Sequence, residues 1–407
     1  EESGINTIAT EVEENADGTI ASLTLNQTAP AEHPVLRPHR LAVGFYDEDP
    51  ATGKIVRTDR FELDVDGEST VVAAAAGKKR PAFILVNDDD LTYTKLRFDA
   101  DSLSFALANL QRFDDALARA VVWLSLWDMT RDGDLAAEKF IDTTLALLAT
   151  ETESTTFRYA LSCMSTTARH YTAPDRRADV VKHVAKELWK LVIAAPGGSD
   201  QQFQLVTAYL GYGEEGDAEF AEHAQGLFDG SLIVAGLEID NNFTWTIINA
   251  LSSVKLIDQA GIDAQLAKRD TTENREFALG AHAVRGDAAA KEWAWNEALN
   301  NADLTNMQLE AVARGFGATP RPDLAEPYAA KYYDVVDWVW KNKSFHMAEA
   351  LLEGLYPYYA DPATLVELGH RWLADHEDAD NALKRIVRGN VESSQRTLKV
   401  RDFNAAL

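Results

Sequence analysis

The sequence predicts a multidomain chain in which a β-sandwich precedes a mainly α-helical solenoid, a curved array of antiparallel helix pairs. Two observations carry this prediction. Before Phe98, apolar residues alternate with polar ones or form short β-rich blocks. After Asp101, they recur at helical spacing. Because this change falls within residues 83–134, we expect a β-sandwich domain over residues 1–98 and a helical domain over residues 99–407.

Composition excludes several classes of protein. The chain has 407 residues, long for one core, and its 46% hydrophobic content is typical of packed domains rather than disorder. Asp and Glu (65) outnumber Lys and Arg (39), which gives a net charge of −26. Such a charge disfavours nucleic acid and anionic membranes as partners. No apolar run approaches the roughly 18 residues of a membrane span. We therefore expect a cytoplasmic protein.

The ends of the chain and its cysteine content add two further expectations. Cys163 is the only cysteine, so the chain can form neither an internal disulfide nor a cysteine-based metal site. The first residues, Glu-Glu-Ser-Gly, show neither an initiator methionine nor a signal-peptide pattern. We expect the sequence to be part of a longer polypeptide.

Alternation of apolar and polar residues places several short strands in the first hundred residues. The segments with the clearest strand pattern are residues 20–25, 40–46, 54–65, 69–73 and 83–86. Residues 15–18 form a predicted turn, residues 47–53 a loop, and Asp66-Gly67 a hairpin turn. Six or seven strands at this spacing predict a small antiparallel sandwich.

Residues 101–407 have the pattern of helices joined by short polar loops, without a strict repeat period. In residues 114–129, two adjoining apolar stripes predict burial on two sides. The stripes consist of Leu117, Val121, Leu124, Ala120, Trp123 and Trp127. Breaks are expected at residues 130–134, 195–200, 211–217, 261–263, 317–323 and 361–362. Asp217, Asp287 and Asp361 are the expected N-caps of the helices that follow them.

Two motifs suggest ligand sites but lack the context that such sites need. Residues 87–90, Asn-Asp-Asp-Asp, have no glycine or distal glutamate at EF-hand positions. We interpret them as a solvated turn at a strand end. Residues 211–216 match G-x-G-x-x-G, but the preceding segment 201–210 is helical in pattern. Glu214 and Glu215 would also repel phosphate. A loop between two helices is the better interpretation.

The histidines show no spacing typical of a metal site. The segment beginning at His376 starts like H-E-x-x-H, but Asp380 replaces the second histidine, and Lys399 stands where a glutamate ligand would be needed. His346 and Glu349 are spaced to pair on one helical face, an arrangement that is usually structural.

No residue is assigned a catalytic, cofactor-binding or metal-binding role, and the residues of any substrate cleft stay unassigned. Cys163 lies in an apolar helical segment, so we expect it to be buried in the hydrophobic core. The aromatic groups Trp293/Trp295, Trp338/Trp340 and Tyr356/Tyr358/Tyr359 are interpreted as packing between helix layers, with peptide contact as the alternative.

Several segments together resemble the C-terminal half of bacterial aminopeptidase N, a zinc-dependent gluzincin aminopeptidase family. In the sandwich they are residues 4–8 (GINTI), 36–44 (LRPHRLAVG) and 85–95 (LVNDDDLTYTK). In the helical part they are residues 127–132 (WDMTRD), 306–308, 315–316, 327–328 and 332–340. The resemblance implies a β-sandwich domain and a helical domain that forms a bowl over a catalytic domain and restricts access to short peptides.

The family's catalytic signatures are missing from this chain. The exopeptidase motif G-A-M-E-N, the zinc helix H-E-x-x-H and the catalytic tyrosine belong upstream in the family, and the two motifs do not occur here. The resemblance therefore implies a noncatalytic part with no cofactor of its own. Zinc would be held by the full-length protein, and the partners would be the upstream catalytic domain and short peptides. The alternative is a free-standing helical solenoid scaffold that binds protein partners.

Overall fold

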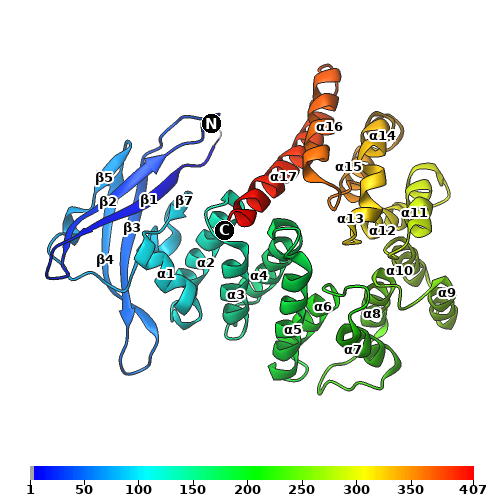
Figure 1. Ribbon diagram of the computed structural model, residues 1–407, viewed down its shortest axis with the longest axis horizontal. Helices are drawn as coiled ribbons and strands as arrows, with labels where there is room; N and C mark the ends of the chain where they lie inside the picture. The colour runs from blue at the N-terminus through cyan, green and yellow to red at the C-terminus, as the bar shows by residue number, and fades with distance from the viewer. Residues whose placement is uncertain (1–3) are drawn as a thin grey trace. The chain divides into compact units, whose positions relative to one another are not determined.

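The computed structural model describes residues 4–407, with strands in the N-terminal part and helices in the remainder (Figure 1). This order of elements confirms the predicted fold class. The strands are β1 Thr7–Glu14, β2 Ile20–Thr28, β3 His39–Glu48, β4 Ile55–Val65, β5 Ser69–Val71, β6 Phe83–Val86 and β7 Lys95–Arg97.

The strands form two sheets, one of four strands in the order β5-β2-β1-β7 and one of three in the order β4-β3-β6. All pairs are antiparallel except β1 with β7, which is parallel. The predicted hairpin at Asp66-Gly67 is wrong, because β4 and β5 belong to different sheets. Gly67 does turn the chain, with φ of +74°, but strand alternation does not specify which sheet a strand joins.

Contacts divide the chain into two compact units. Unit 1 comprises Glu1–Ala168 with Ala406–Leu407, and unit 2 comprises Arg169–Ala405. The change from strands to helices occurs where predicted, since the Asp99 carboxylate accepts hydrogen bonds from the first turn of α1. A domain boundary at residue 98 stays a prediction. The helices of unit 1 are α1 Ala100–Asn109, α2 Ala116–Asp132, α3 Ala137–Leu148 and α4 Ser154–Thr166.

Helix α2 is buried over a wide arc, as predicted, although two residues of the predicted stripes are exposed. Trp123 is 1% exposed, lies against the ring of Phe140 in α3, and donates from Nε1 to Thr144 Oγ1 at 3.1 Å. Leu117 and Leu124, in contrast, are 46% and 41% exposed. Helical periodicity identifies residues that share a face but does not identify which of them a neighbour covers, so the prediction is wrong for Leu117 and Leu124 only.

Unit 2 contains the remaining helices. They are α5 Arg177–Ala194, α6 Asp200–Leu210, α7 Ala218–Asp229, α8 Asn241–Ser253, α9 Gln259–Lys268, α10 Thr272–Ala283, α11 Ala288–Asn300, α12 Asn306–Gly317, α13 Pro322–Ala325, α14 Ala329–Asn342, α15 Phe345–Gly354, α16 Pro362–Asp375 and α17 Asn381–Ala405. None of the described helices is both long and apolar enough to cross a membrane.

The predicted N-caps at Asp217, Asp287 and Asp361 are confirmed, because each carboxylate accepts backbone N–H bonds from the following turn. The predicted break at residues 261–263 is wrong. Those residues lie inside α9, which begins after Asp258, whose side chain accepts from the Gly261 N–H at 2.9 Å. Glycine in the first turn of a capped helix does not end it.

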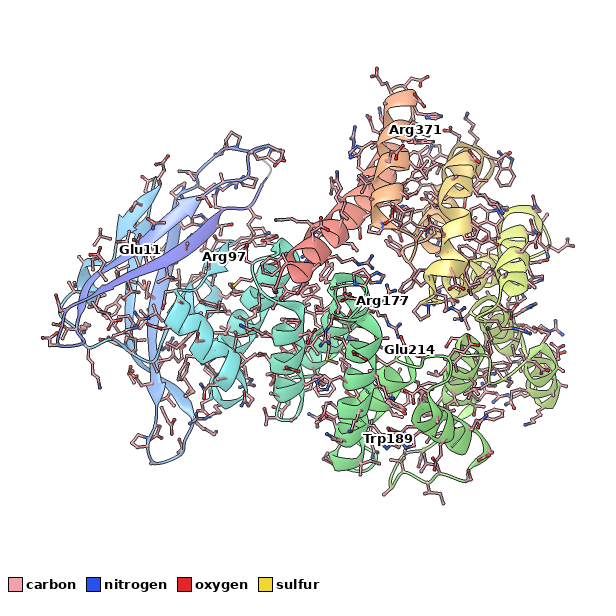
Figure 2. All side chains as sticks on the ribbon, in the orientation of Figure 1. Glu11, Arg97, Arg177, Trp189, Glu214 and Arg371 are labelled. Carbon is pink, nitrogen blue, oxygen red and sulfur yellow. The ribbon has the colours of Figure 1, made fainter. Side chains whose placement is uncertain are left out.

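The helices of unit 2 stack in two layers. Helices α8, α10, α12, α15 and α17 contact one another in succession, while α9, α11, α14 and α16 lie on the outer side (Figure 1). A large core lies between α12, α14, α15, α16 and α17 and includes the fully buried Tyr332, Val336, Leu351 and Tyr356. At the start of the unit, Trp189 of α5 stacks on His223 of α7 with ring centroids 4.0 Å apart (Figure 2).

Candidate ligand groove

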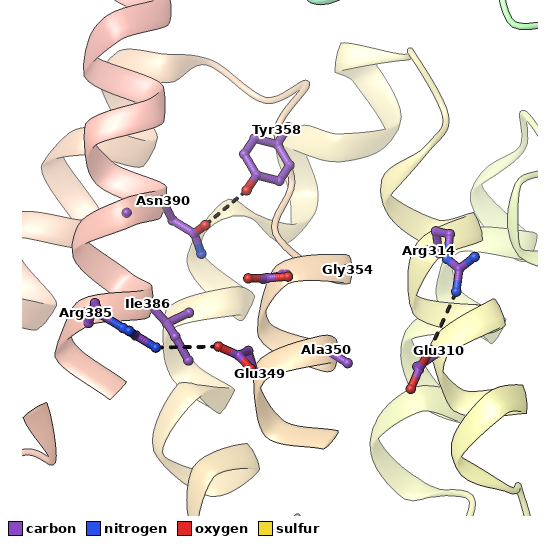
Figure 3. Close-up of a pocket in the computed structure, with 11 residues that line it drawn as sticks. Glu310, Arg314, Glu349, Ala350, Gly354, Tyr358, Arg385, Ile386 and Asn390 are labelled. Atoms are coloured by element: carbon purple, nitrogen blue, oxygen red, sulfur yellow. Dashed lines mark hydrogen bonds and ion pairs between the residues drawn. The ribbon is translucent and has the colours of Figure 1, made fainter. Parts of the chain in front are cut away.

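A groove lies in unit 2 between α12, α15 and α17, with a cavity volume of about 680 Å³ (Figure 3). We call it the α15 groove. Its lining residues are Glu310, Arg314, Glu349, Ala350, Glu353, Gly354, Tyr358, Arg385, Ile386, Gly389 and Asn390. The helices can approach closely here because small residues replace large ones: a Cβ added to Gly354 would lie 2.8 Å from Ala313 Cβ of α12.

The two walls of the α15 groove carry separate charge pairs. On the α12 side, Arg314 Nη2 lies 3.8 Å from Glu310 Oε2, and His346 Nε2 of α15 lies 3.3 Å from Glu310 Oε1. On the α17 side, Arg385 Nη2 lies 3.7 Å from Glu349 Oε1 (Figure 3). These distances are long for hydrogen-bonded pairs, so the guanidinium and carboxylate groups retain capacity for a ligand.

A buried polar network supports the α17 wall. Tyr358 OH donates to Asn390 Oδ1 at 3.0 Å, and Asn390 Nδ2 donates to Tyr332 OH at 2.9 Å. Tyr332 OH in turn donates to Leu352 O at 2.9 Å. Burial raises the pKa of Tyr358 to about 12 and that of Tyr332 well above its ordinary value. Both phenols are therefore neutral at physiological pH and act as positioning groups rather than bases.

A second hollow of about 360 Å³ adjoins the α15 groove along the same layer of helices. It is lined by residues of α8, α10 and α12, including Asn249, Glu276, Phe277 and Met307. Arg314 borders both hollows. The two hollows together offer an extended surface with charged walls and apolar patches.

The α15 groove supplies charged and polar side chains from α12, α15 and α17. The described residues contain no cluster of three or more His, Cys, Asp or Glu side chains that could hold a metal ion. The zinc implied by the family resemblance therefore does not fit the donor groups of residues 4–407, and we derive no step through it.

The structure gives each motif noted in the sequence a structural role. Residues 87–90 do form a turn, with Asn87, Asp89 and Asp90 at positive φ. The turn is not simply solvated, however. Asp88 is 1% exposed and accepts hydrogen bonds from Tyr46 OH at 2.6 Å and Arg57 Nη1 at 2.7 Å. Arg57 pairs with both Asp88 and Asp89, and Arg60 also pairs with Asp89.

The glycine-rich segment 211–216 is a loop between α6 and α7, as predicted. Its Glu215 carboxylate pairs with Lys255 at 3.0 Å and with Arg321 at 2.6 Å. Arg321 also pairs with Asp323 at 2.8 Å. The loop thus joins an ion-pair network that links three connections between helices.

The histidine motifs pair differently from the predicted pattern. His346 and Glu349 do not pair with each other: His346 reaches Glu310 of α12, and Glu349 reaches Arg385 of α17. His376 lies at the end of α16, stacked on Trp372 with centroids 4.5 Å apart. Neighbouring helices supply the partners, and helix spacing alone does not specify them.

Cys163 and most of the aromatic residues belong to the core, as predicted. Cys163 is 3% exposed, and burial raises the pKa of its thiol to about 12. Trp295 and Tyr356 are buried in the core between α12 and α17. Trp338 departs from the prediction, at 42% exposed, and Tyr358 lines the α15 groove.

Sequence reasoning did not identify Glu310, Arg314, Arg385 and Asn390 as groove residues. They come from α12 and α17, and only the packing of these helices around α15 brings them together. No local pattern marks them, because isolated charges on helices usually face solvent.

A comparison with known families identifies the fold. Residues 83–396 match the model of the ERAP1-like C-terminal domain. The chain belongs to this family. It is also 34% identical, over 412 aligned residues, to aminopeptidase N of Streptomyces lividans.

The match to the Streptomyces protein covers 100% of this chain but 48% of that relative. The chain therefore spans about half the length of the aminopeptidase it resembles, and the family match indicates the C-terminal part. This confirms the resemblance seen in the sequence.

Proposed function

We propose that this chain serves as the noncatalytic C-terminal part of a zinc metalloaminopeptidase that removes N-terminal amino acids from peptides. The observation that carries the proposal is the full-length match of this chain to about half of an aminopeptidase N. The α15 groove supports it, since its charged and polar side chains offer contacts for a peptide.

In this proposal, zinc and the catalytic residues lie in an upstream domain of the same polypeptide, and unit 2 restricts which peptides reach them. The α15 groove and the adjoining hollow would contact the peptide. We also propose a cytoplasmic location, which agrees with the charge of −26 and the single cysteine.

The experiment combines the chain with the separately expressed upstream half and measures hydrolysis of an aminoacyl fluorogenic substrate. We expect no turnover by this chain alone and chelator-sensitive turnover after mixing. Chelator-sensitive turnover by this chain alone would contradict the noncatalytic assignment. If mixing the two halves restores no hydrolysis while the chain binds folded protein partners, the scaffold alternative replaces the proposed noncatalytic role.

A groove-filling variant tests the access role separately. Gly389 lines the α15 groove, and a Cβ added there meets nothing within 4 Å, so Gly389→Phe is the variant chosen to add bulk to the groove. In the reconstituted enzyme, we expect slower cleavage of peptides of about ten residues and unchanged cleavage of a single aminoacyl amide. Equal effects on both substrates would show that the groove does not restrict access.

A further inference from the structure

Three arginines gather where the last helix of unit 2 returns to the beginning of the same unit. Arg169 lies in the π-helical turn Thr167–Tyr171, Arg177 is the first residue of α5, and Arg401 lies near the end of α17. We call them the arginine cluster. Figure 2 shows Arg177 and Glu214 on the inner side of the helices of this unit.

Two members of the arginine cluster are buried without a carboxylate partner. Arg401 is 9% exposed; its Nε donates to His170 O at 2.8 Å, and its buried Nη2 has no hydrogen-bond partner. Arg169 is 7% exposed, donates to Gly211 O, and lies over the Tyr212 ring. A buried guanidinium with an unused donor is costly unless something satisfies it.

The arginines are close enough for their charges to act on one another and on His170. Burial and the three arginines together lower the pKa of His170 to about 3. Burial, followed by the charge of Arg177, lowers the pKa of Arg401 to about 10. The cluster is therefore a concentration of positive charge in a chain whose net charge is −26.

Two carboxylates lie near the arginine cluster without forming an ion pair with it. Burial raises the pKa of Glu214, although Arg169 and Arg177 oppose that shift. The charge of Asp361 raises the pKa of Arg401 without a hydrogen bond between them. The Asp361 carboxylate instead accepts the Thr364 N–H at 2.9 Å as an N-cap. Within residues 4–407, no carboxylate forms an ion pair with any of the three arginines.

We propose that Arg169, Arg177 and Arg401 form a binding site for a small oxyanion or carboxylate. Guanidinium groups present paired N–H donors that match the oxygens of phosphate and carboxylate. Arg401 Nη2 supplies a buried donor that is already free of other partners. Because Arg401 belongs to α17 and Arg177 to α5, a bound anion would also hold the two ends of unit 2 together.

Two sources can provide this chemistry: inorganic phosphate and the carboxyl end of a peptide. The test is calorimetric titration of the 407-residue chain at constant ionic strength with three probes. These are inorganic phosphate, an N-acetylated peptide with a free C-terminal carboxylate, and the same peptide with a C-terminal amide. Saturable binding of phosphate identifies a free oxyanion, and binding of the carboxylate peptide but not the amide identifies a peptide end.

The variant Arg177→Gln removes one guanidinium while leaving the Arg401–His170 bond in place. For whichever probe binds the unmodified chain, we expect Arg177→Gln to bind it at least tenfold more weakly. The matched control is Arg371→Gln, since Arg371 of α16 is an exposed arginine that pairs with Glu367 at 2.6 Å. The control should bind as the unmodified chain does.

The proposal would be overturned if none of the probes binds. It would also be overturned if Arg177→Gln binds a probe as tightly as the unmodified chain does. If Arg177→Gln loses its helical circular dichroism, Arg177→Lys keeps the charge without the paired donors and should still weaken binding several-fold. The site does not depend on the proposed role in peptide access, because phosphate tests it without the upstream domain.

Discussion

Lys291 shows how one buried side chain can connect two helices. The residue is 2% exposed, and its Nζ donates to Ala283 O at the end of α10 and to Gly315 O and Phe316 O near the end of α12. Carbonyls at helix C-termini carry partial negative charge, so they suit a cationic donor. Burial nevertheless lowers the pKa of the Lys291 ammonium to about 7, with Asp287 opposing the shift.

The low pKa predicts a specific dependence of stability on pH. An unfolded lysine has a pKa of about 10.4, so between pH 7 and about 10.4 the unfolded state binds the proton that the folded state has lost. The free energy of unfolding should therefore rise with pH in this window, by up to about 1.4 kcal/mol per pH unit.

The variant Lys291→Met should lose this pH dependence, as measured by urea denaturation at pH 7, 8 and 9. Lys268→Met is the control, because Lys268 is exposed and donates to the side chain of Gln265. An unchanged pH slope in Lys291→Met would show that another group is responsible.

A buried ion pair in unit 1 predicts a large effect on stability. Arg119 Nε and Nη2 donate to the Glu151 carboxylate at 2.8 and 3.0 Å, and Arg119 Nη1 donates to Phe113 O at 2.7 Å. Glu151 is 1% exposed. The change Glu151→Gln leaves the Arg119 charge uncompensated and should destabilise the fold by about 3–5 kcal/mol.

Guanidinium chloride denaturation measures this loss. The matched control is Asp114→Asn, which breaks an exposed pair with Lys54 and should cost less than about 1 kcal/mol. If the two variants are equally stable, the Arg119–Glu151 pair does not contribute to the free energy of unfolding as much as its burial predicts.

At the scale of elements, glycines set how closely the inner helices approach. A Cβ added to Gly315 of α12 would lie 2.6 Å from Gly280 O of α10, and one added to Gly317 would lie 2.5 Å from Gly354 O of α15. These obstacles are backbone atoms, which cannot move without shifting a helix. The α15 groove depends on this close spacing.

Two glycine substitutions should therefore have opposite effects. Gly315→Ala should destabilise the chain by about 2 kcal/mol, because it forces α10 and α12 apart. Gly389→Ala in α17 meets nothing within 4 Å and should stabilise the chain by up to about 1 kcal/mol through helix propensity. Thermal unfolding of both variants tests this, and stabilisation by Gly315→Ala would refute the packing argument.

At the scale of the whole molecule, unit 2 is closed by contacts between its two ends. Besides the Arg401–His170 bond, Asn404 Nδ2 donates to Tyr171 O at 3.3 Å. Val400, one turn away, is fully buried. A solenoid whose ends touch gains stability from both ends at once, in contrast to an open stack in which each layer contacts only its neighbours.

Ending the chain at Arg396 removes these contacts. We expect a melting temperature lower by about 5 °C and faster amide exchange at residues 169–177, since the loss of Val400 burial alone is worth about 1.5–3 kcal/mol. Ending the chain at Asn404 removes only exposed residues and is the control. Unchanged exchange at residues 169–177 in the shorter chain would show that the closure is not stabilising.

The order of strands and helices, most helix boundaries and the family could all be predicted from the sequence. Alternation, helical spacing and capping residues such as Asp217 and Asp361 are local signals, so they can be read without knowing the fold. Cys163 was assigned to the core for the same reason.

Three features required the folded structure: which strands share a sheet, which residues of α2 a neighbour covers, and which side chains meet in the α15 groove and the arginine cluster. Glu349 and His346 looked like partners because they lie one turn apart, yet each pairs with a different helix. Such pairings depend on long-range packing, where distant residues become neighbours through the burial of apolar surfaces. The arginine cluster likewise joins Arg169 to Arg401, and no local pattern connects them.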